Sequence, residues 1–515
     1  MAPFSMAYTG AEDCDFQMSY LPLLRLAAPE TIIVITALTV LAADLLAMRE
    51  LELWFRWTVG AMISCLGCVI AVGWMLALPV QENMLEGVFV VDPLTRLVKI
   101  ALLVLTVFTV LLSVERDFTV HVGEYLGLIL LAAVGMMFLV SSEDILMIFV
   151  SLELTSLSLY ILTAFDKKSI RSSEAALKYF LFGGTSAAFT LFGLSLLYGL
   201  SGSTNLGRIA SAIHGPKLDP VLIIAMVMTI TGFGFKVAAA PFHLWAPDVY
   251  QGAPAPSGAF IASGSKVAGF VVLGKVMALG FAGAEGSGGW HAYLPGWVPV
   301  LAIVAAVSMV LGNLVALVQS SVRRLIAYSA IAHGGYMLLA VMSSAPQGMA
   351  SLVYYVITYG LTTVGAFGVV SVVEETNGGD QLSDFAGLSR RAPLLAGSMI
   401  IFMLSLAGIP PLAGFFGKFY IFTAALNGKP GLGLLWLVVL ALGMSAVSLY
   451  YYLQVLKQIL VKPPADSSPP MPARIITQVA IVMLAVAVFG LGCAPNGLVD
   501  ALTQAVKLSG LGPGR

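Results

Sequence analysis

The chain has 515 residues, of which 59% are hydrophobic and 10% are charged, with a formal net charge of −1. Soluble globular domains carry about 25% charged residues, so this composition excludes a soluble protein and indicates a polytopic membrane protein. The balanced charge offers no basic surface for nucleic acid. No polar stretch is long enough to fold as a separate cofactor domain of about 100 residues.

Apolar windows of about 20 residues predict an all-α protein with about fourteen membrane-spanning helices. In chain order these spans lie near 29–48, 57–78, 93–115, 122–140, 142–164, 173–200, 219–247, 256–280, 295–319, 323–343, 348–373, 392–426, 431–459 and 474–495. The loops after odd-numbered spans hold thirteen Lys and Arg residues, whereas the other loops and the termini hold six. Because positively charged loops stay in the cytoplasm, both termini are expected to face outward.

Two spans contain prolines next to a lysine. In the seventh span Pro241 and Pro247 follow Lys236, and in the twelfth a Pro-Pro pair precedes Lys418. A proline removes a helical hydrogen bond and clashes with the preceding turn, so both helices are expected to break near the middle of the membrane. Interrupted helices at corresponding places in two halves indicate an inverted repeat with a transport site between the halves.

The two breaks are five spans apart, and this odd number would give successive repeats opposite topology. Spans 4–8 and 9–13 are therefore predicted to form two inverted five-helix repeats. The expected organisation places the first three spans in residues 1–121, the two repeats in 122–280 and 295–459, and the final span with a C-terminal tail in 460–515.

Several ionisable residues lie inside the apolar spans, above all Glu153, Lys236, Lys266 and Lys418. At about 1.5 Å per residue, Glu153 and Lys266 lie near the midplane, where a side chain cannot easily reach the headgroups. Charged groups at this depth are costly and mark ion pathways or proton relays. Lys178 lies only about one and a half turns into the sixth span, where a side chain stretched to the headgroups is an equally good explanation.

Residues of these types can store and transfer protons. Burial disfavours the charged form of a lysine, whereas an adjacent carboxylate favours it. A change in the separation between Glu153 and Lys236 would therefore make Lys236 bind or release its proton. His243, beside the break of the seventh span, and His333, within the tenth, could extend such a relay or be hydrogen-bonded packing residues. Hydroxyl groups that could hold water between these residues, or simply join helices, belong to Ser263, Ser265, Tyr328, Tyr336, Tyr354, Tyr355 and Tyr359.

The four cysteines, Cys14, Cys65, Cys68 and Cys493, give no disulfide framework. Cys65 and Cys68 form a lone CxxC motif inside an apolar span, with no second pair and no nearby histidine. This pattern favours packing over metal binding or redox chemistry. No metal site and no iron–sulfur site is therefore expected in this chain.

Six segments resemble the antiporter-like subunits of respiratory complex I, the proton-pumping NADH:quinone oxidoreductase. They are VFVVDPLTR (88–96), SLELTSLSLYIL (151–162), SSEAALKYFLFG (172–183), FKVAAAPFHLWAPDVYQGAPAPSGAFIASGSKVAGF (235–270), RLIAYSAIAHGGYML (324–338) and GIPPLAGFFGKFYIF (408–422). Together they run through nearly the whole chain. The M-type subunit of that family typically has Glu where this chain has Lys418, so the chain resembles the N-type subunit more. Pro256-Ser257 replaces the more usual Pro-Val pairing, which we expect to be a packing variation.

The resemblance implies a role for each buried ionisable residue. By motif, Glu153 and Lys236 form the coupling pair, Lys266 is the central relay and Lys418 is the exit-side lysine. Auxiliary positions fall on Lys178 and His243. The implied fold has fourteen helices, two inverted repeats and a polar axis along the membrane arm of the complex.

The resemblance also implies partners and a location. Other membrane-arm subunits, of the M-type and the small K- and J-types, would pack against this chain, and lipid would surround them. NADH, FMN, iron–sulfur clusters and quinone would be bound by partner subunits, so this chain would be a translocase subunit without a redox site of its own. The expected location is the bacterial inner membrane, with both termini in the periplasm.

Three other functions share some of these features. A subunit of a multisubunit Na+/H+ antiporter would have the same fold and buried lysines, although PFHLWAPDVYQGAP (241–254) fits complex I better. A secondary transporter of a small organic solute would use broken-helix ends to bind a carboxylate or an amine, but the row of lysines disfavours it. A subunit that only scaffolds its neighbours would keep its buried charges as structural ion pairs.

Overall fold

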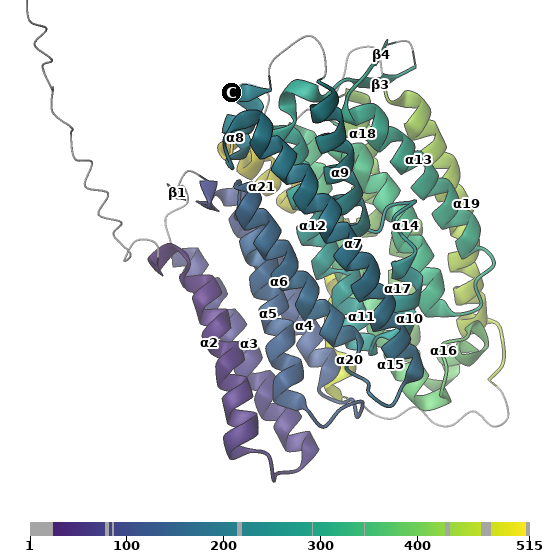
Figure 1. The fold of residues 1–515 in the computed structure, drawn as a ribbon. Coiled ribbons are helices and arrows are strands. Elements are labelled where there is room, and N and C mark those ends of the chain that lie inside the picture. The colour runs from purple at the N-terminus through teal and green to yellow at the C-terminus, as the bar shows by residue number, and fades with distance from the viewer. Residues whose placement is uncertain are drawn as a thin grey trace, which may run out of the picture.

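The computed structural model describes residues 24–77, 82–84, 87–213, 219–290, 292–343, 346–427, 433–464 and 475–510. Within these ranges, twelve helices are long and apolar enough to cross a membrane. They are α2 with its π-helical end η1 (Ala28–Ala47), α3 (Leu53–Ala77), α4 (Pro93–Ser113), α5 (Val122–Val140), α6 (Ile145–Thr163), α7 (Ile170–Ser201), α11 to η3 (Ala255–Gly280), α13 (Trp297–Ala316), α14 (Val322–Val341), α15 (Pro346–Asn377), α19 (Leu435–Leu460) and α20 (Ile475–Cys493). The all-α membrane fold is confirmed (Figure 1).

Two shorter apolar helices end where the sequence predicts breaks. These are α9 (Pro220–Lys236) and α17 (Pro393–Ala407). After the breaks, α10 (Trp245–Gly252) continues the first and α18 (Ala413–Asn427) continues the second. Pro241 lies in the first break, but Pro247 lies in the first turn of α10, where a proline is tolerated, so it does not interrupt the helix. The predicted total of fourteen spans requires each broken pair to cross the membrane as a unit, and this total stays a prediction.

Capping side chains fix where several helices begin. Asp92 accepts a hydrogen bond from the Thr95 backbone N–H at 2.6 Å, at the start of α4. Asp144 accepts from the backbone N–H groups of Leu146 and Met147 at 3.0 and 2.9 Å, at the start of α6. Each cap satisfies amide groups that the first helical turn leaves free, which stabilises a helix by about 1 kcal/mol.

Several short elements were not predicted from the sequence. They are α8 (Leu206–Ala212), α16 (Leu388–Arg391), α21 (Pro495–Leu508), the antiparallel hairpin of β1 (Glu82–Met84) with β2 (Phe89–Val91), and the antiparallel hairpin of β3 (Ser287–Gly289) with β4 (Ala292–Leu294). The expected C-terminal tail is thus partly a helix. α21 is too short to span a membrane, and it buries Leu502 and Val506 on one side as it packs on α4 and α15.

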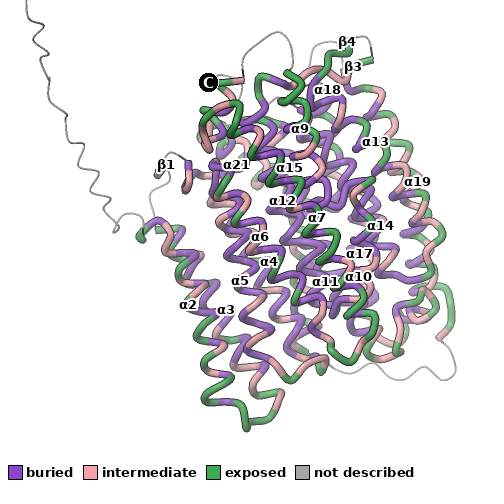
Figure 2. Tube along the Cα trace, viewed as in Figure 1, coloured by how far each residue is buried: buried purple, intermediate pink, exposed green. Residues whose placement is uncertain are grey.

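The helices form one bundle whose interior is closed off from lipid. In Figure 1, α2 and α3 stand at one edge and α13 and α19 at the other, and Figure 2 shows buried residues concentrated between them. The apolar windows of α15 and of the helix from α11 to η3 are 100% buried, whereas that of α7 is 28% buried. The central helices α12 (Gly264–Lys275) and α15 can therefore line a site that lipid does not reach.

Two stretches of the chain repeat the same series of elements. A pair of packed helices, a 32-residue helix and a short helical turn occur as α5 to α8 and again as α13 to η5 (Leu382–Phe385). Isolated bridges join Asp144 to Asn205 in the first stretch and Ser321 to Gln381 in the second. These parallels support the predicted pair of five-helix units, and their inverted relation stays a prediction.

Close helix crossings in both stretches depend on glycine. A Cβ on Gly135 would lie 2.6 Å from the Thr155 hydroxyl oxygen, and one on Gly312 would lie 2.6 Å from the Ala332 backbone nitrogen. Without a side chain at these positions, α5 approaches α6 and α13 approaches α14 closely enough for continuous packing.

Gly312→Ala is expected to destabilise the protein by about 1–3 kcal/mol, because the added methyl group must displace the α14 backbone. The matched control is Gly443→Ala, since a Cβ there meets no atom within 4 Å. The control should be as stable as the wild type or slightly more stable, because Ala favours helix over Gly. Thermal unfolding midpoints of the solubilised protein test this, and equal midpoints for the two variants would contradict the crossing argument.

Candidate functional site

The structure brings the predicted lysines into the interior of the bundle. Lys236 is the last residue of α9, Lys266 lies in α12 and Lys418 in α18, and all three are buried. Glu153 differs, because its side chain on α6 is only half-buried. The four residues therefore belong to four different helices, with Glu153 nearest the outer surface.

Lys236 lies between α6 and α12. Its Nζ donates to the Ser156 hydroxyl at 2.9 Å, one helical turn after Glu153 on α6, and Lys236 interacts electrostatically with the Glu153 carboxylate. The stem of the Lys236 side chain packs against Gly269 of α12, one turn from Lys266. Lys236 thus binds α6 at Ser156, one turn from Glu153, without forming an ion pair with that carboxylate within 4.0 Å, and its stem lies beside the helix that carries the next lysine.

Two side chains on neighbouring elements donate to carbonyl groups in the last turn of α9. The Trp245 indole N–H donates to the Phe235 carbonyl at 3.0 Å, and the Ser186 hydroxyl donates to the Gly232 carbonyl at 3.1 Å. Backbone groups of the break pair as well, because the Ala238 and Ala239 N–H groups donate to the Phe235 and Gly234 carbonyls at 3.0 and 2.8 Å. An unsatisfied backbone group at membrane depth costs several kcal/mol, so this pairing makes the break possible.

Lys266 binds to α14, on the other side of the bundle centre from α9. Its Nζ donates to the Ala330 carbonyl of α14 at 2.6 Å and lies 5.7 Å from the centre of the Tyr359 ring. A carbonyl oxygen and an aromatic face both favour a cation. This lysine therefore joins α12 to α14 and α15 at the centre of the bundle.

Lys418 closes the break between α17 and α18. Its Nζ donates to the Leu406 and Ala407 carbonyls at 3.0 and 2.9 Å and to the Ser445 hydroxyl at 2.9 Å. Leu406 and Ala407 are the last residues of α17, where carbonyls lack helical partners and the helix dipole attracts positive charge. The broken helix thus supplies the acceptors for its own lysine, which also lies 5.4 Å from the Tyr336 ring centre.

His333 lies between Lys266 and Lys418 and interacts electrostatically with both. Its Nδ1 is 2.6 Å from the Tyr355 hydroxyl and its Nε2 is 3.1 Å from the Tyr452 hydroxyl. Both ring nitrogens therefore have a partner that can donate or accept a proton. The sequence placed His333 mid-helix but did not identify Tyr452, which lies on α19, more than a hundred residues away in the chain.

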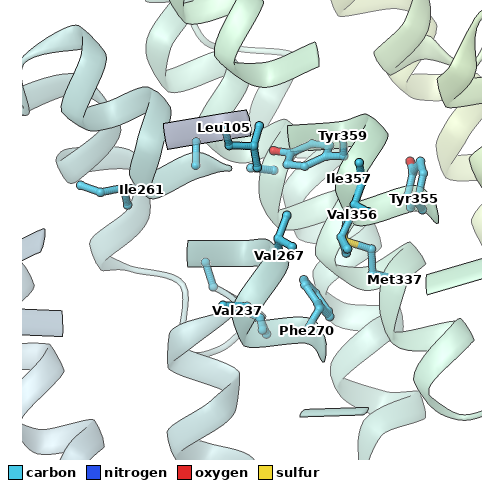
Figure 3. Close-up of a cluster of buried hydrophobic side chains, with 14 of the residues drawn as sticks. Leu105, Val237, Ile261, Val267, Phe270, Met337, Tyr355, Val356, Ile357 and Tyr359 are labelled. Carbon is cyan, nitrogen blue, oxygen red and sulfur yellow. The ribbon is translucent and has the colours of Figure 1, made fainter. Parts of the chain in front are cut away.

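Packed apolar side chains surround this polar row. Figure 3 shows Val267 and Phe270 of α12, Met337 of α14 and the rings of Tyr355 and Tyr359 from α15 in one cluster. The cluster excludes bulk water from the lysines, so protons can pass only through the polar groups themselves or through water bound to them.

Two weaker candidates lie away from the centre. His243 is buried in the break between α9 and α10. The Lys178 side chain is 38% exposed and pairs with Glu174 and Asp248, each at 2.7 Å. In the structure the Lys178 ammonium group belongs to an ion-pair cluster at the edge of the bundle. Its role in proton transfer stays a prediction.

Other buried charges were missed from the sequence. The Lys99 Nζ pairs with Glu30 at 2.6 Å, and the fully buried Lys275 donates to the Val140 carbonyl at 2.8 Å. Lys99 and Lys275 both lie inside predicted spans, which was a signal available in the sequence. Their partners lie on other helices, so only packing identifies them.

The described residues contain no group of three His, Cys, Asp or Glu side chains placed to hold a metal. Cys68 packs among apolar side chains of α2, α3 and α5, whereas Cys14 lies outside the described residues. Two cavities have no lysine in their lining: an apolar one of about 200 Å³ beside the break of α9, and one of about 390 Å³ with charged side chains where α10 meets α11.

Comparisons with known proteins agree with this architecture. Residues 142–445 match the family described as "NADH:quinone oxidoreductase/Mrp antiporter, TM". The chain is 50% identical over 488 residues to NADH-quinone oxidoreductase subunit N 2 of Acidobacterium capsulatum, covering 93% of this chain and 98% of that relative.

Two solved structures are also similar. A chain of respiratory complex I from Thermus thermophilus with bound aureothin is 34% identical, with a TM-score of 0.76 over 92% of this chain and 99% of that one. A chain of the Mrp complex from Dietzia has a TM-score of 0.78 over 94% of this chain and 97% of that one, but is only 20% identical and so shows the fold alone.

Removing one partner of the Glu30–Lys99 pair is expected to destabilise the protein, because it leaves an uncompensated buried charge. Lys99→Met should cost about 3–5 kcal/mol. The double variant Glu30→Gln with Lys99→Met should recover most of that loss, since no buried charge remains. Thermal unfolding of the solubilised protein measures both, and a double variant no more stable than Lys99→Met would refute the pairing argument.

Proposed function

Because the chain belongs to the NADH:quinone oxidoreductase/Mrp antiporter family of transmembrane subunits, we propose that it is the antiporter-like N-type subunit of a respiratory complex I. In this role it moves protons through its own buried side chains, coupled to quinone reduction in other subunits. NADH, FMN, iron–sulfur clusters and quinone are bound by those partners. The chain lies in a bacterial inner membrane with both termini in the periplasm.

The observation that carries the proposal is a row of protonatable groups through the bundle. Glu153, Lys236, Lys266, His333 and Lys418 follow one another from the outer face of α6 to the break of α17 and α18. Each group can take up and release a proton. Lys236 interacts with Glu153, and His333 interacts with both Lys266 and Lys418, whereas Lys236 and Lys266 are related only by the Lys236 stem lying beside Gly269, one turn from Lys266 on α12. Protons move along the row when the separation or hydration of neighbouring groups changes.

Lys178 and His243 lie beside this row and are assigned supporting roles. His243 lies in the break next to Lys236, and Lys178 pairs with Asp248 on the helix that follows the break. We assign both residues to holding the geometry of the break, with His243 also able to carry a proton.

The face around Glu153 indicates where a neighbouring subunit packs. Leu146, Val150, Leu157 and Ile161 on the same face of α6 are exposed, and Glu153 lies half-buried among them. An ionisable group facing lipid is costly, so this face is covered by a transmembrane helix that offers polar side chains. We assign this position to a small K- or J-type subunit, and the opposite edge of the bundle to an M-type subunit.

A second candidate function is that of a subunit of an Mrp-type Na+/H+ antiporter. The family description and the similarity of fold to the Dietzia Mrp chain favour considering it. The relative with 50% identity over nearly its whole length is a quinone oxidoreductase subunit, and this places the first proposal ahead.

The proposal is tested with Lys236→Ala in assembled membranes. We expect quinone-coupled proton translocation to be largely lost, because the proton can no longer pass from the Glu153 side to Lys266. NADH-driven quinone reduction and proton translocation are measured together, with assembly checked on a native gel. The matched control is Lys457→Ala, an exposed lysine in the last turn of α19 that should leave both rates unchanged. Normal pumping by Lys236→Ala in an intact complex would favour the scaffold alternative.

A photo-crosslinking amino acid at Val150 tests the placement of the neighbour. We expect a covalent adduct with a small membrane subunit, because Val150 is exposed beside Glu153 on α6. Adducts are identified by mass spectrometry in the intact complex. Adducts with lipid alone would show that this face is bare and would overturn the placement.

A further inference from the structure

Two consecutive arginines at the start of α14 hold the end of α10. The Arg323 guanidinium donates to the Gln251 and Ala253 carbonyls at 2.7 and 3.1 Å, and these carbonyls lie at the C-terminal end of α10. Arg324 donates to the Asp248 carboxylate at 2.8 Å and to the Gln251 side chain at 3.3 Å. One helix of the second five-helix unit thus caps and clamps a half-helix of the first.

Asp248 is the centre of this cluster. Its carboxylate pairs with Arg324 from one side and with Lys178 of α7, at 2.7 Å, from the other. Arg323 is buried and pairs in turn with Glu374 near the end of α15, at 3.2 Å. An ion pair alone at a surface contributes little, but a partly buried network that shares partners fixes geometry more firmly.

The clamped half-helix is the part of the seventh span that follows the break. Trp245, at the start of α10, donates a hydrogen bond to the Phe235 carbonyl and also stacks on Tyr179 of α7, with the two ring centres 4.4 Å apart. Any movement of α10 therefore changes the surroundings of the turn that ends at Lys236. The clamp limits such movement from the far end of the same half-helix.

The other side of the clamp leads to the centre of the proton row. Arg324, Ala330 and His333 lie on one unbroken helix, and Arg324 is about 9 Å from Ala330 along its axis. Gly312 and Gly335 hold α14 tightly against α13, so α14 moves as a rigid unit with its neighbour. When the arginines move, α14 therefore also moves the Ala330 carbonyl, which binds Lys266, and the imidazole of His333.

We propose that Arg324 and Asp248, supported by Arg323, are positioning residues that couple the break of α9 and α10 to Lys266 and His333. The inference rests on the proposed function, because it assigns a link between two parts of the same proton row. Neither residue carries the proton. The pair keeps the first and second five-helix units in register, so that movement at the break is transmitted along α14.

The test uses Arg324→Gln, Asp248→Asn and the double variant in the assembled complex. We expect the number of protons translocated per electron to fall in each single variant, by no more than it falls in Lys236→Ala, which removes a member of the row itself. The double variant should lose no more than the worse single variant, because each single variant already removes the Arg324–Asp248 contact. Asp248→Asn also weakens the pair with Lys178, so it is expected to be the worse of the two. Losses that multiply would show that the two residues act independently and would overturn the proposal, as would an unchanged proton-to-electron ratio.

Two further variants separate positioning from a general structural effect. Arg324→Lys keeps the charge and should restore most of the ratio, whereas a purely structural role would change only the amount of complex on a native gel. Arg390→Gln is the matched control, because it removes an exposed arginine near another helix start and should leave the ratio unchanged. A failure of Arg324→Lys to exceed Arg324→Gln in this ratio would count against the clamp.

Lys236→Ala is measured in parallel to keep the two proposals distinguishable. If Lys236→Ala stops proton translocation while Arg324→Gln leaves the ratio intact, only the clamp is wrong. If Lys236→Ala pumps normally, the proposed function itself fails, and the clamp fails with it.

Discussion

Three lysines buried in an apolar bundle all need oxygen acceptors, and nearly every backbone carbonyl around them is already bonded within a helix. This constraint shapes the centre of the molecule. Lys236 uses the Ser156 hydroxyl, Lys266 uses the Ala330 carbonyl, and Lys418 uses two carbonyls at the end of α17 together with a hydroxyl. Without such partners, an ammonium group at this depth would cost several kcal/mol.

The two broken helices provide acceptors for their lysines in different ways. Where α17 ends, its free carbonyls become the site of a lysine, so one defect in the helix satisfies one buried charge. Where α9 ends, its last carbonyls already accept from backbone N–H groups of the break and from the Trp245 indole, and Lys236 instead binds a hydroxyl of α6. The two breaks look alike in sequence but bind their lysines differently. Lys418 is held within its own span, whereas Lys236 is held by a helix that also carries a carboxylate.

Close packing determines which groups of this polar row lie next to one another. Gly135 and Gly312 bring paired helices together, and apolar side chains such as Val267 and Phe270 surround the polar groups. Since packed interiors resist continuous deformation, changes in the row are expected to occur as shifts of whole helices. The half-helices α10 and α18 are natural places for such shifts, and ion pairs at the end of α10 set how far it can move.

The sequence by itself determined the apolar spans, the two breaks and the burial of Lys236, Lys266 and Lys418, because each depends on composition within one short window. It also carried motifs that indicate the family. The tertiary structure alone decided which oxygen each lysine binds, that Glu153 is half-buried while Lys178 reaches an ion-pair cluster, and that Tyr452 meets His333. It alone revealed the Lys99–Glu30 and Arg324–Asp248 pairs. Such contacts join helices far apart in the chain, and their geometry follows from how whole helices pack and not from any local pattern.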